Sequence, residues 1–156
     1  MEARGARPDD LEPCLAIVRG LPDFFTADVP ARVRGDSERH DGWILAEGEE
    51  IVAFAIIDRR SPEAAEILWI AVQPGRHRSG YGTRLLDHVL GALRDQGVAL
   101  VEAKTLDRSV DYTPYEATRA FWERNGFVQV DRIDEPPGWE PGNPAALLVA
   151  ALSTTR

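Results

Sequence analysis

A segment rich in glycine and arginine, residues 75–82, carries the groups of this chain best suited to binding a phosphate. Glycine lets a backbone approach a ligand closely. Arg76 and Arg78, with Arg84 shortly after them, bring positive charge into a chain whose net charge is −8. If a helix begins here, its first N–H groups and the positive end of its dipole also attract an anion. The segment therefore predicts a phosphate site.

Two predicted elements position this segment. The run from Ile67 to Val72 is continuously apolar and is stopped by Pro74, which predicts a buried strand. After the glycines, an apolar stripe at helical spacing predicts a helix over about residues 80–96. The stripe consists of Leu85, Leu86, Val89, Leu90 and Leu93. A strand that passes through a glycine turn into a helix points its free N–H groups, here those of residues 78–83, at one place.

Two common phosphate-binding patterns do not fit the segment. The P-loop pattern G-x-x-x-x-G-K-[ST] is half present through Gly75 and Gly80, but Tyr81 stands where the lysine is needed. The dinucleotide pattern G-x-G-x-x-G fails because Leu85 stands in place of its last glycine.

The six residues from His77 to Gly82 instead resemble the pyrophosphate loop of the GNAT acetyltransferase superfamily. That loop usually reads [Q/R]-x-x-G-x-[G/A] after a strand ending in V-x-P, and His77 departs from its first position. The resemblance implies that acetyl-CoA is the cosubstrate. The residues implied to bind it are Ile70, Ala71, Val72, His77, Arg78, Ser79, Gly80, Tyr81, Gly82, Thr83, Phe121 and Arg124.

A second segment, residues 115–127 (Y-E-A-T-R-A-F-W-E-R-N-G-F), resembles the superfamily pattern N-x-x-A-x-x-F-Y-E-K-x-G-F. Trp122 stands where that pattern has a tyrosine, often the acid that protonates the leaving thiolate. An indole N–H cannot deliver a proton in this way. We therefore expect Tyr115, or Tyr112, to be the acid; the alternative for Tyr115 is a packing role.

The resemblance also implies a mechanism. The strands over residues 66–72 and 98–105 splay apart, and the pantetheine arm pairs with residues 70–72 as an added strand. The N–H of Val72 stabilises the oxyanion. A primary amine of a small molecule or peptide attacks the thioester directly; a cationic acceptor suits the acidic chain. Glu66 is the expected base; the alternative is an exposed residue at the start of a strand.

Periodicity and turn residues predict one α/β (α+β) domain over residues 1–156, with element order (β)ααβββαβαββ. We expect a central mixed, mostly antiparallel, twisted sheet that splays in the middle and has helices on both faces. The predicted strands cover residues 2–7, 43–46, 51–57, 64–72, 98–105, 127–133 and 145–152. The predicted helices cover residues 11–20, 28–40, 80–96 and 114–125.

Composition narrows the function. The net charge of −8 argues against a nucleic-acid surface. Neither a membrane-spanning run nor a signal peptide is present, and with one cysteine, Cys14, no internal disulfide can form, so we expect a cytoplasmic protein. No residues have metal-ligand spacing. Oligomeric state, monomer or homodimer, stays open. A non-catalytic acyl-CoA-binding module is the rival function.

Three features of the sequence have an acceptor-binding interpretation, either as the first choice or as the alternative. Residues 134–144 contain four prolines, so no regular element fits there. This loop, with Glu135, Trp139 and Glu140, is a possible lid over the acceptor, or else a long connection or a dimer contact. Trp69 is expected in the core, with the acceptor pocket as the alternative. One of Phe24 and Phe25 is expected in the core, with the alternative that one of them walls an acceptor channel.

Overall fold

The computed structural model describes residues 1–77 and 79–153, and its elements follow the predicted order. The strands are β1 (Glu2–Gly5), β2 (Asp41–Glu47), β3 (Glu50–Ser61), β4 (Ala64–Val72), β5 (Leu100–Leu106), β6 (Val128–Ile133) and β7 (Ala145–Ala151). The helices are α1 (Leu11–Arg19), α2 (Val29–Arg39), α3 (Tyr81–Asp95) and α4 (Pro114–Arg124), with a short 3-10 helix η1 (Pro8–Asp10) before α1.

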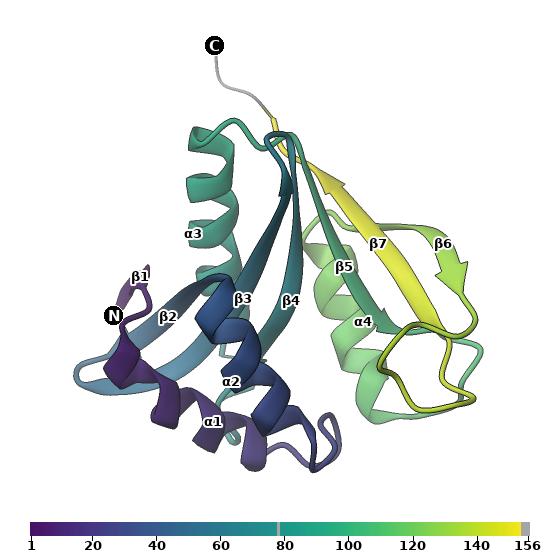
Figure 1. The fold of residues 1–156 in the computed structure, drawn as a ribbon, viewed down its shortest axis with the longest axis horizontal. Coiled ribbons are helices and arrows are strands. Elements are labelled where there is room, and N and C mark those ends of the chain that lie inside the picture. Colours follow the sequence, from purple (N-terminus) through teal and green to yellow (C-terminus); the bar gives the residue numbers. More distant parts are fainter. Residues whose placement is uncertain (78, 154–156) are drawn as a thin grey trace.

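All seven strands form one sheet in the order β1-β2-β3-β4-β5-β7-β6. Within the described residues, β4 and β5 are the one parallel pair, and every other neighbouring pair is antiparallel. Helices α1 and α2 cover one face of the sheet, while α3 and α4 pack on the other (Figure 1). The predicted mixed, mostly antiparallel sheet with helices on both faces is therefore confirmed.

The sheet divides where β4 meets β5. Their ladder pairs residues 64–67 with residues 100–103 and then stops, although β4 continues to Val72 and β5 to Leu106. Figure 1 shows the two strands diverging beyond this point. We call this divergence, after Ile67 and Ala103, the fork. A bulge in β4 at Leu68, where the register against β3 shifts, lies at its base.

Several hydrogen bonds join the two sides of the fork, and three of them involve helix α2 or the loop between α1 and α2. Tyr112 and Tyr115 donate their hydroxyl protons to the carbonyls of Asp23 and Phe24, in the loop between α1 and α2. Arg32 of α2 donates to the carbonyl of Gly138, in the loop between β6 and β7. We call these three the cross-fork hydrogen bonds. Each joins residues about ninety or more positions apart, so they tie together halves of the sheet that share only a short ladder.

The structure corrects two details at the N-terminus. Strand β1 ends at Gly5, because the backbone N–H of Arg7 donates to the Asp10 carboxylate at 2.7 Å and η1 begins at Pro8. Asp10 occupies the N-cap position of α1, but its side chain makes no capping hydrogen bond to that helix. It forms an ion pair with Arg4 at 2.7 Å instead, and this bond holds the pKa of Asp10 below its usual value.

Candidate functional site

The start of α3 lies beside open space and, as far as the described residues go, has backbone N–H groups without an acceptor. Gly80 caps the helix with φ +82°, a left-handed conformation that favours glycine, and a Cβ placed there would meet no atom within 4 Å. As a glycine, Gly80 has no side chain that could cap the helix. Among the described residues, none accepts a hydrogen bond from the N–H groups of Tyr81, Gly82 or Thr83. These donors, at the positive end of the α3 dipole, can therefore receive an anion.

At Gly82, helix α3 lies against both α4 and β4. A Cβ there would lie 3.0 Å from Cε1 of Phe121 and 3.5 Å from Cγ2 of Val72. One helical turn further along α4, Asn125 donates to the hydroxyl of Thr83 at 3.3 Å. The structure thus brings together four of the residues predicted to bind the cofactor. Arg124 is exposed at the C-terminal end of α4.

Arg76 does not contribute a free charge to this turn. Its guanidinium donates to Gln73 at 2.7 Å and forms ion pairs with Glu47 at 3.3 Å and Glu50 at 3.0 Å. Tyr81 donates its hydroxyl proton to the same Glu47 at 2.5 Å, which raises the pKa of the tyrosine. Arg76 therefore fastens the turn to the β2–β3 hairpin.

The predicted convergence of three arginines is wrong for Arg76, because these acids lie in the neighbouring hairpin. Arg84 is exposed on α3. Arg78 lies outside the described residues. The ring of His77 contacts the Val72 carbonyl at 2.9 Å, and Ser79 donates its hydroxyl proton to the Arg76 carbonyl.

Backbone groups of β4 point into the fork. The N–H of Gln73 donates to the Val52 carbonyl of β3 at 2.8 Å. Because N–H directions alternate along a strand, the N–H groups of Val72 and Ile70 point away from β3, toward the side that β5 has left. The side chains of Ile70 and Val72 pack toward α3 and α4, whereas Ala71 packs toward α1 and α2.

Glu66 lies at the base of the fork and is buried, with only 4% of its surface exposed. The alternative of an exposed residue at the strand start is therefore wrong. Its carboxylate accepts hydrogen bonds from Lys104, at 3.0 Å, and from Arg60. Burial pushes the pKa of Glu66 upward, but these two bonds outweigh burial and hold the pKa below its usual value.

Glu102 is the neighbour of Glu66 across the parallel ladder. Burial and the charge of Glu66 raise the pKa of Glu102. Two carboxylates with opposite pKa shifts therefore stand side by side where the fork begins. The sequence did not single out Glu102, and only the register of the ladder places it there.

Tyr115 is half-buried, and its hydroxyl donates to the Phe24 carbonyl at 3.0 Å. Burial raises its pKa to about 12, so the phenol keeps its proton at any ordinary pH. Its ring lies edge-on to Phe24 at 5.4 Å, and Phe24 in turn lies 6.2 Å from His77. These aromatic side chains bring the start of α4, the α1–α2 loop and the turn before α3 together.

Trp122, at the position of the usual tyrosine acid, is a core residue. It is 4% exposed, and its ring packs edge-on against Phe121 at 5.2 Å and Phe127 at 4.8 Å. An indole buried in this way cannot reach a leaving group.

The face of the sheet covered by α2 carries a polar and aromatic cluster around Trp69, which is half-buried. Its indole N–H donates to Asp36 at 2.7 Å, and the guanidinium of Arg32 lies 5.4 Å from the ring centroid. Phe25 packs edge-on against it at 6.0 Å. Sequence reasoning missed Arg32 and Asp36, although their spacing of four residues in a predicted helix places them on one face.

The expected core phenylalanine is not found, since both Phe24 and Phe25 are half-buried. In the loop between β6 and β7, Trp139 is half-buried and Glu135 and Glu140 are exposed. Within residues 1–77 and 79–153, no group of three or more His, Cys, Asp or Glu side chains could hold a metal ion. The described helices include none with the length and apolar character needed to cross a membrane.

Comparison with solved structures finds many chains of the same fold. A GNAT-family protein from Desulfovibrio desulfuricans aligns with a TM-score of 0.80 and 23% identity, covering 97% of this chain and 99% of that one. The ribosomal-protein-S18-alanine N-acetyltransferase of Escherichia coli aligns at 0.79 and 22% identity, covering 99% and 96%. An aminoglycoside 6'-N-acetyltransferase complexed with coenzyme A aligns at 0.76 and 14% identity, covering 100% and 99%.

At these identities the structural likeness shows the fold alone. A comparison with curated protein sequences gave no match. The family model described as the acetyltransferase (GNAT) domain, however, matches residues 38–129, more than half of the chain. This match includes β4, the turn, α3, the start of the fork and α4. The chain therefore belongs to the GNAT family of acyl-CoA-dependent N-acyltransferases.

Proposed function

We propose that this protein transfers the acetyl group of acetyl-CoA to a primary amine by direct attack in a ternary complex. The observation that carries the proposal is the fork: the β4–β5 ladder stops after residues 67 and 103, so β4 presents unpaired backbone groups beside an uncapped helix. A diphosphate at Gly80–Thr83 would place the attached pantetheine arm along Ile70–Val72. There it would pair as an extra strand.

In this proposal, the N–H of Val72 donates to the thioester oxygen and stabilises the negative charge that develops on it. Tyr115 is the proposed donor to the leaving sulfur. Because the pKa of Tyr115 is about 12, it carries its proton throughout, but it is a weaker acid than a thiol of ordinary pKa, about 8.5. We therefore assign it a hydrogen bond to the thiolate, made after it releases the Phe24 carbonyl, with the proton itself coming from water.

An amine of ordinary pKa, about 10.4, is protonated at neutral pH and must lose a proton before it attacks. Glu66 is the proposed base, acting through water, since both its oxygens accept bonds from Lys104 and Arg60. The cluster of Trp69, Arg32 and Asp36 is the proposed acceptor surface, and the loop over residues 134–144 is its proposed cover, because Arg32 binds Gly138.

The test is a thermal shift with acetyl-CoA. Ligand at about 100 times its Kd stabilises the folded state by about 2.7 kcal/mol, a rise of several degrees for a domain of this size. Gly82→Glu should abolish the rise, since its carboxylate would occupy the place of the phosphates. Gly91→Glu is the matched control, because it adds the same charge to the same helix at an open position. A shift that survives Gly82→Glu would place the coenzyme elsewhere.

The second candidate is a protein that binds acyl-CoA without turning it over. It is favoured by Trp122, which fills the core, and by the tyrosine hydroxyls, which are already bonded to carbonyls. Release of free thiol from acetyl-CoA over a broad amine panel separates the two. A clear thermal shift with no thiol released by any amine would favour the non-catalytic protein.

A further inference from the structure

Lys104 is the one lysine in the sequence, in which 17 arginines supply the rest of the Lys and Arg residues. A guanidinium keeps its proton in proteins, whereas the amine of a lysine can act as a nucleophile. The chain therefore has a single side-chain amine that could accept an acetyl group. Its position decides whether a coenzyme in the fork could reach it.

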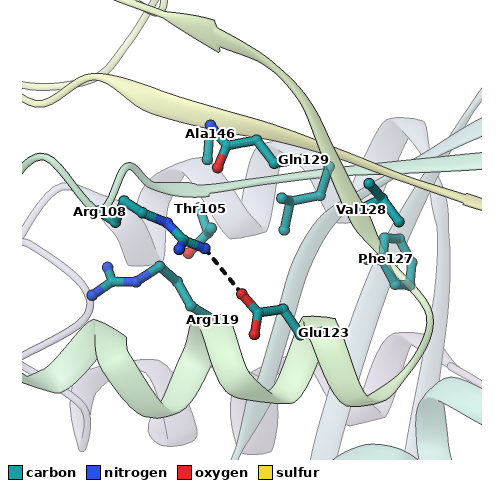
Figure 2. A pocket seen from close by; sticks show the side chains of 9 residues that line it. Thr105, Arg108, Arg119, Glu123, Phe127, Val128, Gln129 and Ala146 are labelled. Carbon is teal, nitrogen blue, oxygen red and sulfur yellow. Dashed lines mark hydrogen bonds and ion pairs between the residues drawn. The ribbon is translucent and has the colours of Figure 1, made fainter.

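Lys104 stands at the mouth of the fork and points toward the proposed acceptor surface. It is the first residue of β5 beyond the ladder, whose last pair joins Ile67 to Ala103. Ala103 packs in the core shared with α3 and α4, and Figure 2 shows Thr105 on the side of α4, near Arg119. Since side chains alternate along a strand, Lys104 points to the opposite face, which is the face that α2 covers.

The ammonium of Lys104 is hydrogen-bonded to the proposed base. Its Nζ atom lies 3.0 Å from Oε2 of Glu66. The side chain of Lys104 is 26% exposed, so it is not locked inside the core. A lysine must give up a proton before its nitrogen can attack a thioester. Glu66 is in position to take that proton without an intervening water.

The amine can also reach the place proposed for the thioester. Lys104 stands beside Leu68, one residue beyond the ladder, where the two strands have only begun to diverge. Val72, whose N–H is assigned to the thioester oxygen, lies four residues further, about 13 Å along the strand. An extended lysine stem covers about half of this span, and the hydrogen bond to the oxygen and the attack distance, about 3 Å each, cover most of the rest. Nζ therefore approaches the acetyl carbon when it turns away from Glu66.

We propose that this protein acetylates its own Lys104. This inference rests on the function proposed for the fork. Glu66 takes one proton from the ammonium, and Nζ then attacks the acetyl carbon, so that a C–N bond forms and the C–S bond breaks. The nitrogen loses a second proton, which reaches the departing thiolate through water, and Glu66 passes its proton to the solvent. The products are acetyl-lysine, coenzyme A as its thiol, and one proton.

Intact-protein mass spectrometry tests this directly. The full-length protein, mixed with acetyl-CoA in a buffer without amines, should gain one acetyl group, and peptide mapping should place it on Lys104. The α-amino group of Met1 is the internal reference for purely chemical acetylation, because Met1 is exposed and precedes β1 at the edge of the sheet.

A second acetyl donor separates the site from ordinary chemistry. S-acetyl-N-acetylcysteamine carries the same thioester but has no diphosphate for the start of α3 to bind. The rate with acetyl-CoA should saturate and should exceed the rate with the small thioester about tenfold or more, because only the coenzyme is held next to Lys104.

Two variants locate the acceptor. Lys104→Arg keeps a positive charge beside Glu66 and should gain no acetyl group. Adding Arg34→Lys to Lys104→Arg is the matched control, because it restores one lysine at an exposed position of α2. That lysine should react no faster with acetyl-CoA than with the small thioester.

The proposal is overturned if the wild-type protein gains no acetyl group on Lys104, or if the small thioester or the relocated lysine reacts equally fast. It is also overturned if the rate constant rises in proportion to protein concentration, since the transfer would then take place between molecules. A protein that binds acetyl-CoA and releases thiol with added amines, but leaves Lys104 unmodified, would lose this inference and keep the proposed function. A protein that shows neither a thermal shift nor thiol release would lose both.

Discussion

Replacing Glu66 with glutamine tests the charged cluster at the base of the fork. The carboxylate is buried and holds Lys104 and Arg60. Removing one partner of a fully buried ion pair costs about 3–5 kcal/mol. Here the side chains of Lys104 and Arg60 are 26% and 49% exposed and stay partly hydrated, and glutamine also relieves the repulsion from Glu102. We therefore expect Glu66→Gln to lower the free energy of unfolding by about 1–3 kcal/mol at pH 7.

The loss should depend on pH in a definite direction. The pKa of Glu66 is lowered in the folded state, so the unfolded chain binds its proton more readily. The stabilisation is then fully present above the ordinary pKa of about 4.5 and disappears as the pH falls through the lower, folded-state value. The difference between wild type and Glu66→Gln should therefore shrink steadily from about pH 5 to about pH 3.

Urea unfolding of both proteins across this range measures the difference. Glu63→Gln is the matched control, because Glu63 is exposed in the turn just before β4 and should change the unfolding free energy by less than about 0.5 kcal/mol. If Glu66→Gln is as stable as wild type at pH 7, or if its deficit is the same at pH 3 and pH 7, the assignment of Glu66 as a buried, ionised partner of Lys104 is refuted.

Tyr115→Phe should lower turnover about tenfold or more without changing the Kd of coenzyme A. Tyr112→Phe is the control, because it removes a similar hydrogen bond to the α1–α2 loop and should turn over as fast as the wild type. Equal turnover in the two variants would rule out Tyr115 as the donor to sulfur. Gly91→Ala should raise the free energy of unfolding by about 0.5–1 kcal/mol, because Gly91 lies inside helix α3 and alanine favours a helix more than glycine does. The added Cβ has space, since the nearest atom would lie 3.8 Å from it. A lowered melting temperature would contradict the packing of α3. Cys14 is 6% exposed, and burial raises the pKa of its thiol to about 12. At pH 8 the native protein should therefore react with a thiol reagent only as fast as it unfolds. Rapid labelling without urea would show that Cys14 on α1 is not buried.

The order of elements could be predicted from the sequence because its signals are local. The apolar run before Pro74 predicted β4 with both ends correct, and the stripe beginning at Leu85 predicted α3 to within one residue at each end. Gly80 could be interpreted because the left-handed cap is a local requirement of the backbone. The close approach of Gly82 to Phe121, which belongs to a distant segment, could be expected only through the resemblance to the family. Boundaries were less accurate where a side chain decided them, as at β1.

The surroundings of the site could not be predicted, because they depend on contacts between distant segments. Arg76 looked like a phosphate ligand, and only the β2–β3 hairpin, more than twenty residues earlier, shows that Glu47 and Glu50 hold it. Glu66 looked exposed or catalytic, and its pairing with Lys104 depends on the register of the parallel ladder. The cross-fork bonds of Tyr112 and Tyr115 have no local signal at all.

The fork also bears on self-association. Beyond the ladder, residues 68–72 of β4 and 104–106 of β5 form two unpaired strand edges, and such edges commonly recruit strands from other chains and start aggregation. Here the two edges face each other inside the sheet, and the opening between them closes where the β4–β5 ladder begins. The cross-fork hydrogen bonds connect the two sides of this opening. We infer that these unpaired edges, which lie inside the sheet and are bridged by side chains, are less open to strands of neighbouring copies than the edges of an ordinary sheet.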